Sequence, residues 1–205
     1  DLNTTEGTWT SVDISPDGNT MALGSTDGSV MLWNIEDNSE TIIYEGTSII
    51  HDVVFSNKGK YLAFGDEKGI LKLYDLATKS VLEDLVGHKS RIDAIAFSKD
   101  DNLLASASYD GTVQVWLTDK LEELPVVIKD NASYIWDLSF TDDNKYLVTG
   151  GNNGEIRVWP TDAKDIAAVM CSKIEKNMTA EEWKRYVGSE IDFRNTCKSL
   201  LFEEK

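Results

Sequence analysis

Apolar and polar residues follow one recurrent pattern in four stretches of this chain. Each stretch starts with a short apolar run, passes through a polar turn into a second run, and reaches a third run after a turn that contains glycine. Short apolar runs bounded by Gly, Asn, Asp and Ser are typical of β-strands joined by tight turns. The pattern therefore predicts three consecutive strands in each stretch, the last of them closing on an aromatic residue.

The third stretch shows these elements most clearly. Alternation over residues 92–97 places Ile92, Ala94 and Ala96 on one face of the first strand, and Ile95 and Phe97 on the other. Because both faces are apolar, we expect this strand to be buried on both sides. Residues 103–108 and 112–116 are the predicted second and third strands. Weaker signals predict a fourth strand at 81–86, with counterparts at 40–44 and 124–128.

The four stretches align without a gap and repeat at an almost constant spacing. The first Ser or Thr, the turn glycine and the closing aromatic each advance by 41, 42 and 43 residues from one stretch to the next. These positions are Ser15, Ser56, Ser98 and Thr141; Gly28, Gly69, Gly111 and Gly154; and Trp33, Tyr74, Trp116 and Trp159. A period of about 40–45 residues with four strands per unit is the pattern of a β-propeller blade.

Several short motifs within the repeat resemble WD40 repeats, which build closed propellers from four-stranded blades. They are the Gly87-His88 pair, the Tyr109-Asp110-Gly111 turn, and the endings Trp33-Asn34 and Tyr74-Asp75. The resemblance implies an all-β fold, with four four-stranded blades over residues 1–160 and a helical C-terminal cap over 161–205. WD40 rings usually close with seven or eight blades. The resemblance therefore implies that an N-terminal segment, a second copy or a partner chain supplies the remainder of the propeller.

The same resemblance implies a structural tetrad in which a His, a Ser or Thr, an Asp and a Trp are hydrogen-bonded. Only the third copy has all four, as His88, Ser106, Asp110 and Trp116. We expect the corresponding corner to be less rigid in the other copies, since the first lacks the His, the second has Lys68 and Tyr74, and the fourth has Asn153.

A His, Ser and Asp in one repeat also invite comparison with a catalytic triad. A triad needs an exposed nucleophile beside an oxyanion site, whereas the spacing places Ser106 inside a blade. His51, the other histidine, has no partner at metal-ligand spacing. The sequence therefore predicts no catalytic residue, no metal site and no cofactor.

In WD40 propellers, the residues around the start of the first strand and the residue before the turn Asp line the narrow rim of the ring. Carried over by position, these are Thr8, Thr10, Thr26, Ile49, His51, Glu67, Arg91, Asp93, Tyr109, Tyr134, Trp136 and Asn152. We expect Arg91, Tyr109, Tyr134 and Trp136 to meet at one junction, and Trp, Tyr and Arg dominate interface hot spots. The partner-binding prediction comprises these four with Asp93, His51, Glu67 and Asn152. The alternative is that Tyr134 and Trp136 only fill the space between blades.

Residues from 161 onward follow a different pattern. Ile166, Val169, Met170 and Ile174 have helical spacing, and a capping box at 179–182 predicts a second short helix. The tail also resembles the cap of WD40 regions in large bacterial signalling proteins that carry NTPase, caspase-like or kinase modules. That resemblance implies an alternative function as a ligand-sensing or autoinhibitory domain. Cys171 and Cys197 flank the cap and could form a disulfide, although thiols more often stay reduced in a cytosol.

Charge narrows the range of partners. The chain has 20 basic and 36 acidic residues, and the excess of acidic residues lies in the repeats. Nucleic acid is a poor ligand for such a field. The excess can serve solubility alone, or it can match a basic partner. No apolar run reaches the roughly 18 residues of a membrane span, and no targeting segment is visible. We therefore expect a non-catalytic, cytoplasmic module that binds a protein or peptide.

Overall fold

The computed structural model describes residues 7–129 and 133–162, together with Asp165 and Thr179. The chain divides between Val158 and Trp159 into two units, and the described strands belong almost entirely to the first. Nearly all of the predicted helical cap lies outside the described residues, as do Cys171 and Cys197.

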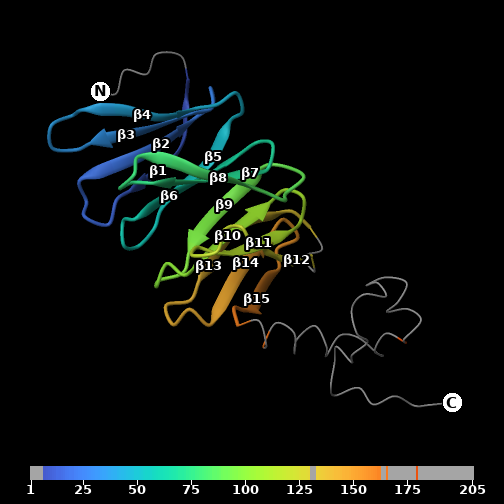
Figure 1. Ribbon diagram of the computed structural model, residues 1–205. Helices are drawn as coiled ribbons and strands as arrows, with labels where there is room; N and C mark the ends of the chain where they lie inside the picture. Colours follow the sequence, from blue (N-terminus) through green and yellow to red (C-terminus); the bar gives the residue numbers. More distant parts are fainter. Residues whose placement is uncertain (1–6, 130–132, 163–164, 166–178, 180–205) are drawn as a thin grey trace. The chain divides into compact units, whose positions relative to one another are not determined.

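The described strands form four separate sheets, one for each repeat, which we call the first to fourth blades (Figure 1). Neighbouring strands in each sheet are consecutive in the chain. The first blade contains β1 (Trp9–Ile14), β2 (Thr20–Ser25), β3 (Ser29–Asn34) and β4 (Glu40–Glu45), and the second contains β5 (Ile50–Phe55), β6 (Tyr61–Asp66), β7 (Ile70–Asp75) and β8 (Ser80–Val86). The third contains β9 (Ile92–Phe97), β10 (Leu103–Ser108), β11 (Val113–Leu117) and β12 (Val126–Ile128), and the fourth contains β13 (Ile135–Phe140), β14 (Tyr146–Gly151) and β15 (Ile156–Pro160).

The fourth blade has three strands among the described residues, where the repeat predicts four. Its last strand ends at Pro160. Proline has no backbone N–H to donate to a sheet ladder, so it is a natural end for this strand. Among the described residues, the fourth blade therefore lacks the outer strand that the other three contain.

Glycine is required in the turn that joins the second and third strands. Gly69 has φ +82, a conformation that side chains disfavour. The backbone also approaches the carbonyl of Ser90 so closely that a Cβ atom on Gly69 would lie 2.5 Å from its oxygen. The equivalent glycines of the other blades also have positive φ, which explains the regular glycine in the repeat.

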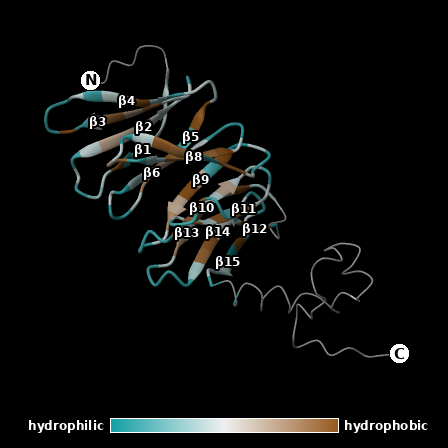
Figure 2. Ribbon diagram, viewed as in Figure 1, coloured by the Kyte–Doolittle hydropathy of each residue, from teal (hydrophilic) through white to brown (hydrophobic). Residues whose placement is uncertain are grey.

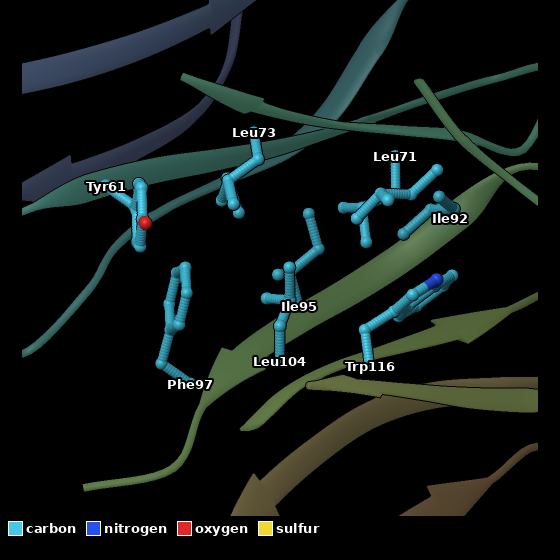
Figure 3. Close-up of a cluster of buried hydrophobic side chains, with 10 residues drawn as sticks. Tyr61, Leu71, Leu73, Ile92, Ile95, Phe97, Leu104 and Trp116 are labelled. Atoms are coloured by element: carbon cyan, nitrogen blue, oxygen red, sulfur yellow. The ribbon is translucent and has the colours of Figure 1, made fainter. Parts of the chain in front are cut away.

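Neighbouring blades pack face to face through apolar side chains. Apolar residues gather on the strands, while the connecting turns are polar (Figure 2). Between the second and third blades, Tyr61, Leu71 and Leu73 on one side face Phe97, Ile95, Leu104 and Trp116 on the other (Figure 3). A second cluster joins Ala22 and Val30 of the first blade to residues of the second, among them Val53, Phe55 and Phe64.

One predicted face assignment in β9 is wrong. Strict alternation puts Ile92 on the face opposite Ile95, but a Cβ atom on Gly65 of the second blade would contact both side chains. The β9–β10 ladder shifts register between Ala107 and Ser108, which leaves Asp93 without a ladder partner. This one-residue bulge changes the side-chain alternation, so Ile92 joins Ile95 in the same core.

Candidate interaction surface

A β-bulge near the start of the first strand recurs in every blade. The ladder shifts between Trp9 and Ser11, between Ile50 and Asp52, and between Ile135 and Asp137, as well as at Asp93. The residues that this leaves unpaired are Thr10, His51, Asp93 and Trp136. Bulges re-aim a side chain away from the regular alternation. One rim position of each repeat is therefore a bulge residue, which periodicity alone did not indicate.

A repeated backbone hydrogen bond holds the other rim residues in pairs. In each blade, the N–H of the residue after the second strand donates to the carbonyl of the residue two positions before the bulge, at 2.9–3.0 Å. The donor and acceptor pairs are Thr26 and Thr8, Glu67 and Ile49, Tyr109 and Arg91, and Asn152 and Tyr134. The structure thus brings these rim positions together at one edge of each blade.

Three rim side chains touch at the junction of the third and fourth blades. The rings of Tyr109 and Tyr134 stack with centroids 3.8 Å apart and 9° between their planes. The guanidinium carbon of Arg91 lies 4.7 Å from the centroid of the Tyr109 ring, and its Nε atom is 2.9 Å from Asp93 Oδ1. Stacking and the cation–π contact hold Arg91 in place, with its charge shared between Tyr109 and Asp93.

The charged rim residues of the second and third blades also influence each other. His51 Nε2 contacts Glu67 Oε2 within the second blade. Burial raises the pKa of Asp93, while the Arg91 guanidinium and, more weakly, His51 act in the opposite direction. The four residues therefore form one electrostatic group that spans two blades.

Trp136 and Tyr134 have different surroundings. Tyr134 packs against Tyr109 of the preceding blade, so it contributes to the contact between blades. Trp136 is 55% exposed, and no ring contact joins it to other described residues. Space filling between blades is therefore part of the role of Tyr134, but it does not account for Trp136.

The four tetrad residues of the third blade lie close together. His88 Nε2 is 2.6 Å from Ser106 Oγ, and His88 Nδ1 is 3.5 Å from Asp110 Oδ2. The imidazole meets the Trp116 ring edge-on at 6.4 Å. Thr112 Oγ1 adds a contact to His88 Nδ1 at 3.0 Å, and sequence reasoning missed this residue.

Burial and hydrogen bonds together determine the protonation states of His88 and Asp110. The His88 side chain is fully buried, and burial lowers its pKa, although Asp110 acts in the opposite direction. Burial alone would raise the pKa of Asp110, but hydrogen bonds from Thr112 and from the Lys89 N–H bring it below its usual value. The arrangement is a neutral imidazole beside a carboxylate, enclosed within the blade.

In the second blade, Lys68 stands at the position of the turn Asp, and Asp66 accepts the hydrogen bonds of this turn instead. In the third blade, Asp110 Oδ1 accepts the N–H of Thr112 and Ser108 Oγ accepts the N–H of Asp110. In the second blade, Asp66 Oδ1 accepts both equivalent bonds, from Lys68 and Ile70, each at 2.9 Å. The turn therefore keeps its side-chain support. The signal in the sequence was an Asp two positions before Lys68.

The outer faces of the first and fourth blades carry apolar residues that face no neighbouring blade among the described residues. Val12 and Ile14 of the first blade are 58% and 53% exposed, whereas the equivalent Val53 and Phe55 of the second are 1% and 6% exposed. On the fourth blade, Ile156 and Val158 are exposed, although the equivalent Leu71 and Leu73 are buried. These two faces have the composition of an interface between blades.

Within the part of the chain that the structure describes, no cluster of His, Cys, Asp and Glu is arranged to hold a metal ion. The same residues include no helix with the length and apolar character needed to cross a membrane.

The WD domain, G-beta repeat family matches residues 2–34, 79–116 and 123–160, more than half of the chain. Among curated proteins, the LST8 homolog of Drosophila melanogaster is 33% identical over 132 residues, which cover 60% of this chain and 42% of that protein. RACK1z of Arabidopsis thaliana, a small ribosomal subunit protein, is 32% identical over 129 residues, covering 54% and 39%. The chain therefore spans about two fifths of the length of these relatives.

Solved structures share the fold. The crystal structure of the RRP9 WD40 repeats has a TM-score of 0.70 and 23% identity, covering 80% of this chain and 51% of that one. The crystal structure of the computationally designed Ika4 protein has a TM-score of 0.66 and 27% identity, covering 79% and 96%. The constant repeat spacing, the four consecutive blades and the family match together show that this chain belongs to the WD40 repeat family.

Proposed function

We propose that this chain is a non-catalytic module that binds a protein or peptide along the rim of its second, third and fourth blades. The observation that carries the proposal is the exposed indole of Trp136 at a bulge, two residues after the stacked Tyr134. Aromatic side chains beside an immobilised Arg are typical of interface hot spots. Trp136 lies on β13, and Tyr134 and Arg91 directly precede β13 and β9, so their positions are set before a partner arrives.

A basic partner surface fits the charge of the chain. The formal net charge is −16, and Glu67 and Asp93 place carboxylates on the rim beside His51 and Arg91. Complementary charge accelerates encounter and improves specificity more than it raises affinity. We therefore expect binding of the partner to weaken with added salt.

Further blades are the second kind of partner that we propose. The exposed apolar faces of the first and fourth blades match, position by position, faces that are buried between blades elsewhere in the chain. In the RRP9 WD40-repeat structure, this chain matches 51% of the other chain, so that chain extends well beyond the matched part. A preceding segment or another chain would supply blades that cover these faces.

A comparison of two exposed aromatics tests the rim proposal. The wild-type chain and its Trp136→Ala variant are immobilised and exposed to extract from the source cells, and the captured proteins are quantified by mass spectrometry. We expect Trp136→Ala to lose the partner while its thermal unfolding stays unchanged, because the residue is largely exposed.

The matched control is Tyr146→Ala. Tyr146 is an exposed aromatic of the same blade at the opposite end of β14 from the rim turn. Equal loss of capture in both variants would show that the rim is not the contact surface. Unfolding of Trp136→Ala would show instead that the indole belongs to the core.

A further inference from the structure

A groove of about 430 Å³ lies beside the outer strands of the third blade, separate from the aromatic rim. Its apolar lining includes Val86, Leu124 and Val127, and Leu124 is 94% exposed. Lys89 and Lys129 add two cationic side chains, and Gln114 lies in its wall. The volume is within the roughly 300–1,000 Å³ typical of ligand sites.

The register of the strands explains why this junction is open. At the junction of the first and second blades, Tyr44 packs on Phe64 and lies 5.2 Å from Lys72 Nζ. Tyr44 pairs with Val30, and the equivalent pair in the second blade is Leu85 with Leu71. Leu85 is smaller than Tyr44 and belongs to the apolar cluster, so no ring covers the third blade at the equivalent position.

Gln114, which occupies the position of Lys72 in the third blade, has an unmet hydrogen-bonding group. The residue is 1% exposed, and its Oε1 atom has no hydrogen-bond partner. The amide lies directly against Gly87, where a Cβ atom would overlap it. A buried acceptor without a hydrogen-bond partner destabilises the folded chain. A ligand that donates a hydrogen bond to Gln114 Oε1 would remove this cost. An apolar surface patch alone would not explain an unpaired acceptor at this position.

The groove also differs from the rest of the chain in charge. Lys89 and Lys129 have no carboxylate partner among the described residues, on a chain with a formal net charge of −16. The nearby Asp110 is already engaged by the Lys89 N–H and by Thr112. The groove therefore offers two free ammonium groups beside an apolar floor.

We propose that this groove binds an extended acidic peptide segment of a partner protein. The segment places an apolar side chain on Val86, Leu124 and Val127. Its carboxylates pair with Lys89 and Lys129, and one of its N–H groups donates to Gln114 Oε1. This site requires an acidic ligand, whereas the rim favours a basic one, so the two surfaces bind different segments.

Two synthetic peptides test the proposal on the 205-residue chain. The probe is acetyl-Glu-Asp-Leu-Val-Asp-Glu-amide, and its counterpart has Lys in place of each acidic residue. Binding is followed by two-dimensional NMR of the ¹⁵N-labelled chain. We expect the acidic peptide to shift the Gln114 side-chain amide and the backbone signal of Val127, and the basic peptide to leave both unchanged.

Variants distinguish the contribution of the two lysines from that of Gln114. Lys89→Glu combined with Lys129→Glu and, separately, Gln114→Leu should each weaken the acidic peptide roughly tenfold or more, the equivalent of at least 1.4 kcal/mol. The control is Lys68→Glu, which changes an exposed lysine of the neighbouring blade. It should leave the affinity for the acidic peptide within about twofold of wild type. Gln114→Leu should fold normally, because it removes an unpaired polar atom.

Absence of binding at millimolar peptide would overturn the proposal, as would equal affinity for both peptides. Shifts confined to Tyr109 and Tyr134 would place the peptide on the rim and also reject the groove. Loss of rim binding in Trp136→Ala with peptide binding retained would support two independent sites.

Discussion

The carboxylate of Asp101 in the third blade caps the turn of the second blade, accepting the backbone N–H of Asn57 at 2.7 Å. Its other oxygen accepts the N–H of Lys58, also at 2.7 Å. Asp101 has φ +60, and Asn144 occupies the equivalent position of the fourth blade with φ +57. Asn144 Oδ1 accepts the N–H of Lys99 at 2.7 Å. A left-handed Asx residue thus joins each of these blades to the one before it.

The junction of the first and second blades lacks this hydrogen bond because its residues differ at both equivalent positions. The left-handed position of the second blade is Gly59, which has no side chain to accept a hydrogen bond. Opposite it, Pro16 occupies the position of Asn57, and a Cβ atom on Gly59 would lie 3.7 Å from the proline ring. Proline has no N–H that needs an acceptor. The donor and the acceptor are therefore absent together.

Replacing Asp101 by Gly should measure the contribution of this cap. Glycine keeps the left-handed backbone without strain, so the variant removes only the carboxylate. We expect the free energy of unfolding to fall by about 1.5–3 kcal/mol, the range of hydrogen bonds to charged groups. Urea unfolding provides the measurement, and Asp101→Asn, which keeps one oxygen, should lose less. Equal free energies of unfolding for Asp101→Gly and wild type would show that the cap does not contribute to stability.

A double-mutant cycle at Pro16 and Gly59 should recreate the cap at the first junction. Pro16→Ala introduces an N–H, and Gly59→Asn introduces an acceptor that tolerates the left-handed conformation. We expect the two changes to be coupled by about 1 kcal/mol in the free energy of unfolding. Gly59→Ala serves as the control, because its methyl group makes only an ordinary van der Waals contact with the Pro16 ring and accepts no hydrogen bond. The control should show no coupling with Pro16→Ala.

Asp52 should make the stability of the propeller depend on pH. Burial raises the pKa of Asp52 to about 6, although its carboxylate accepts hydrogen bonds from the Ile95 N–H and Ser11 Oγ. Because the folded pKa exceeds the unfolded value, this group contributes most below pH 4. Its contribution then falls by up to about 3 kcal/mol as the pH rises through the folded pKa of about 6.

The measurement is the difference in unfolding free energy between wild type and Asp52→Asn at pH 4 to 7. Wild type should become less stable relative to the variant as the pH rises through this window. Asp143→Asn gives a control with little change in this window: a hydrogen bond from Thr141 lowers the pKa of the exposed Asp143, so its contribution is lost only as the pH falls below about 4. A wild-type and Asp52→Asn difference that does not vary with pH would contradict the prediction.

Lysine substitutions at equivalent positions of two blades should distinguish an exposed blade face from a buried one. Phe55→Lys places a charge in the packed junction of the first two blades and should unfold the chain, with a loss of more than about 3 kcal/mol. Ile14→Lys changes the equivalent exposed position and should alter stability by less than about 0.5 kcal/mol. Light scattering should show that wild type associates and that Ile14→Lys associates less. A wild type that remains monomeric at high concentration would argue against a neighbouring blade on this face.

Local patterns were sufficient for the elements of this fold. The strands of residues 92–97 and 103–108 and the turn at Gly111 follow from side-chain alternation and from the conformational freedom of glycine, which act over a few residues. The rim pairs were predictable because the repeat carries a known pattern onto positions such as Arg91 and Tyr109. The bulge at Asp93 was not predictable, since one extra residue reverses the alternation without a distinct composition.

The sequence by itself determined that the chain contains four copies of a three-strand pattern with WD40 motifs, because period, turn glycines and closing aromatics are local and repeated. Only the tertiary structure decided how the copies are joined. Asp101 and Asn57 are 44 residues apart, and an exposed-looking Asp in a polar turn has no local feature that reveals its partner. The same holds for the stack of Tyr109 on Tyr134 and for the unpaired Gln114. These contacts depend on how one sheet lies against the next, and the hydrophobic pattern that builds each sheet does not determine that arrangement in detail.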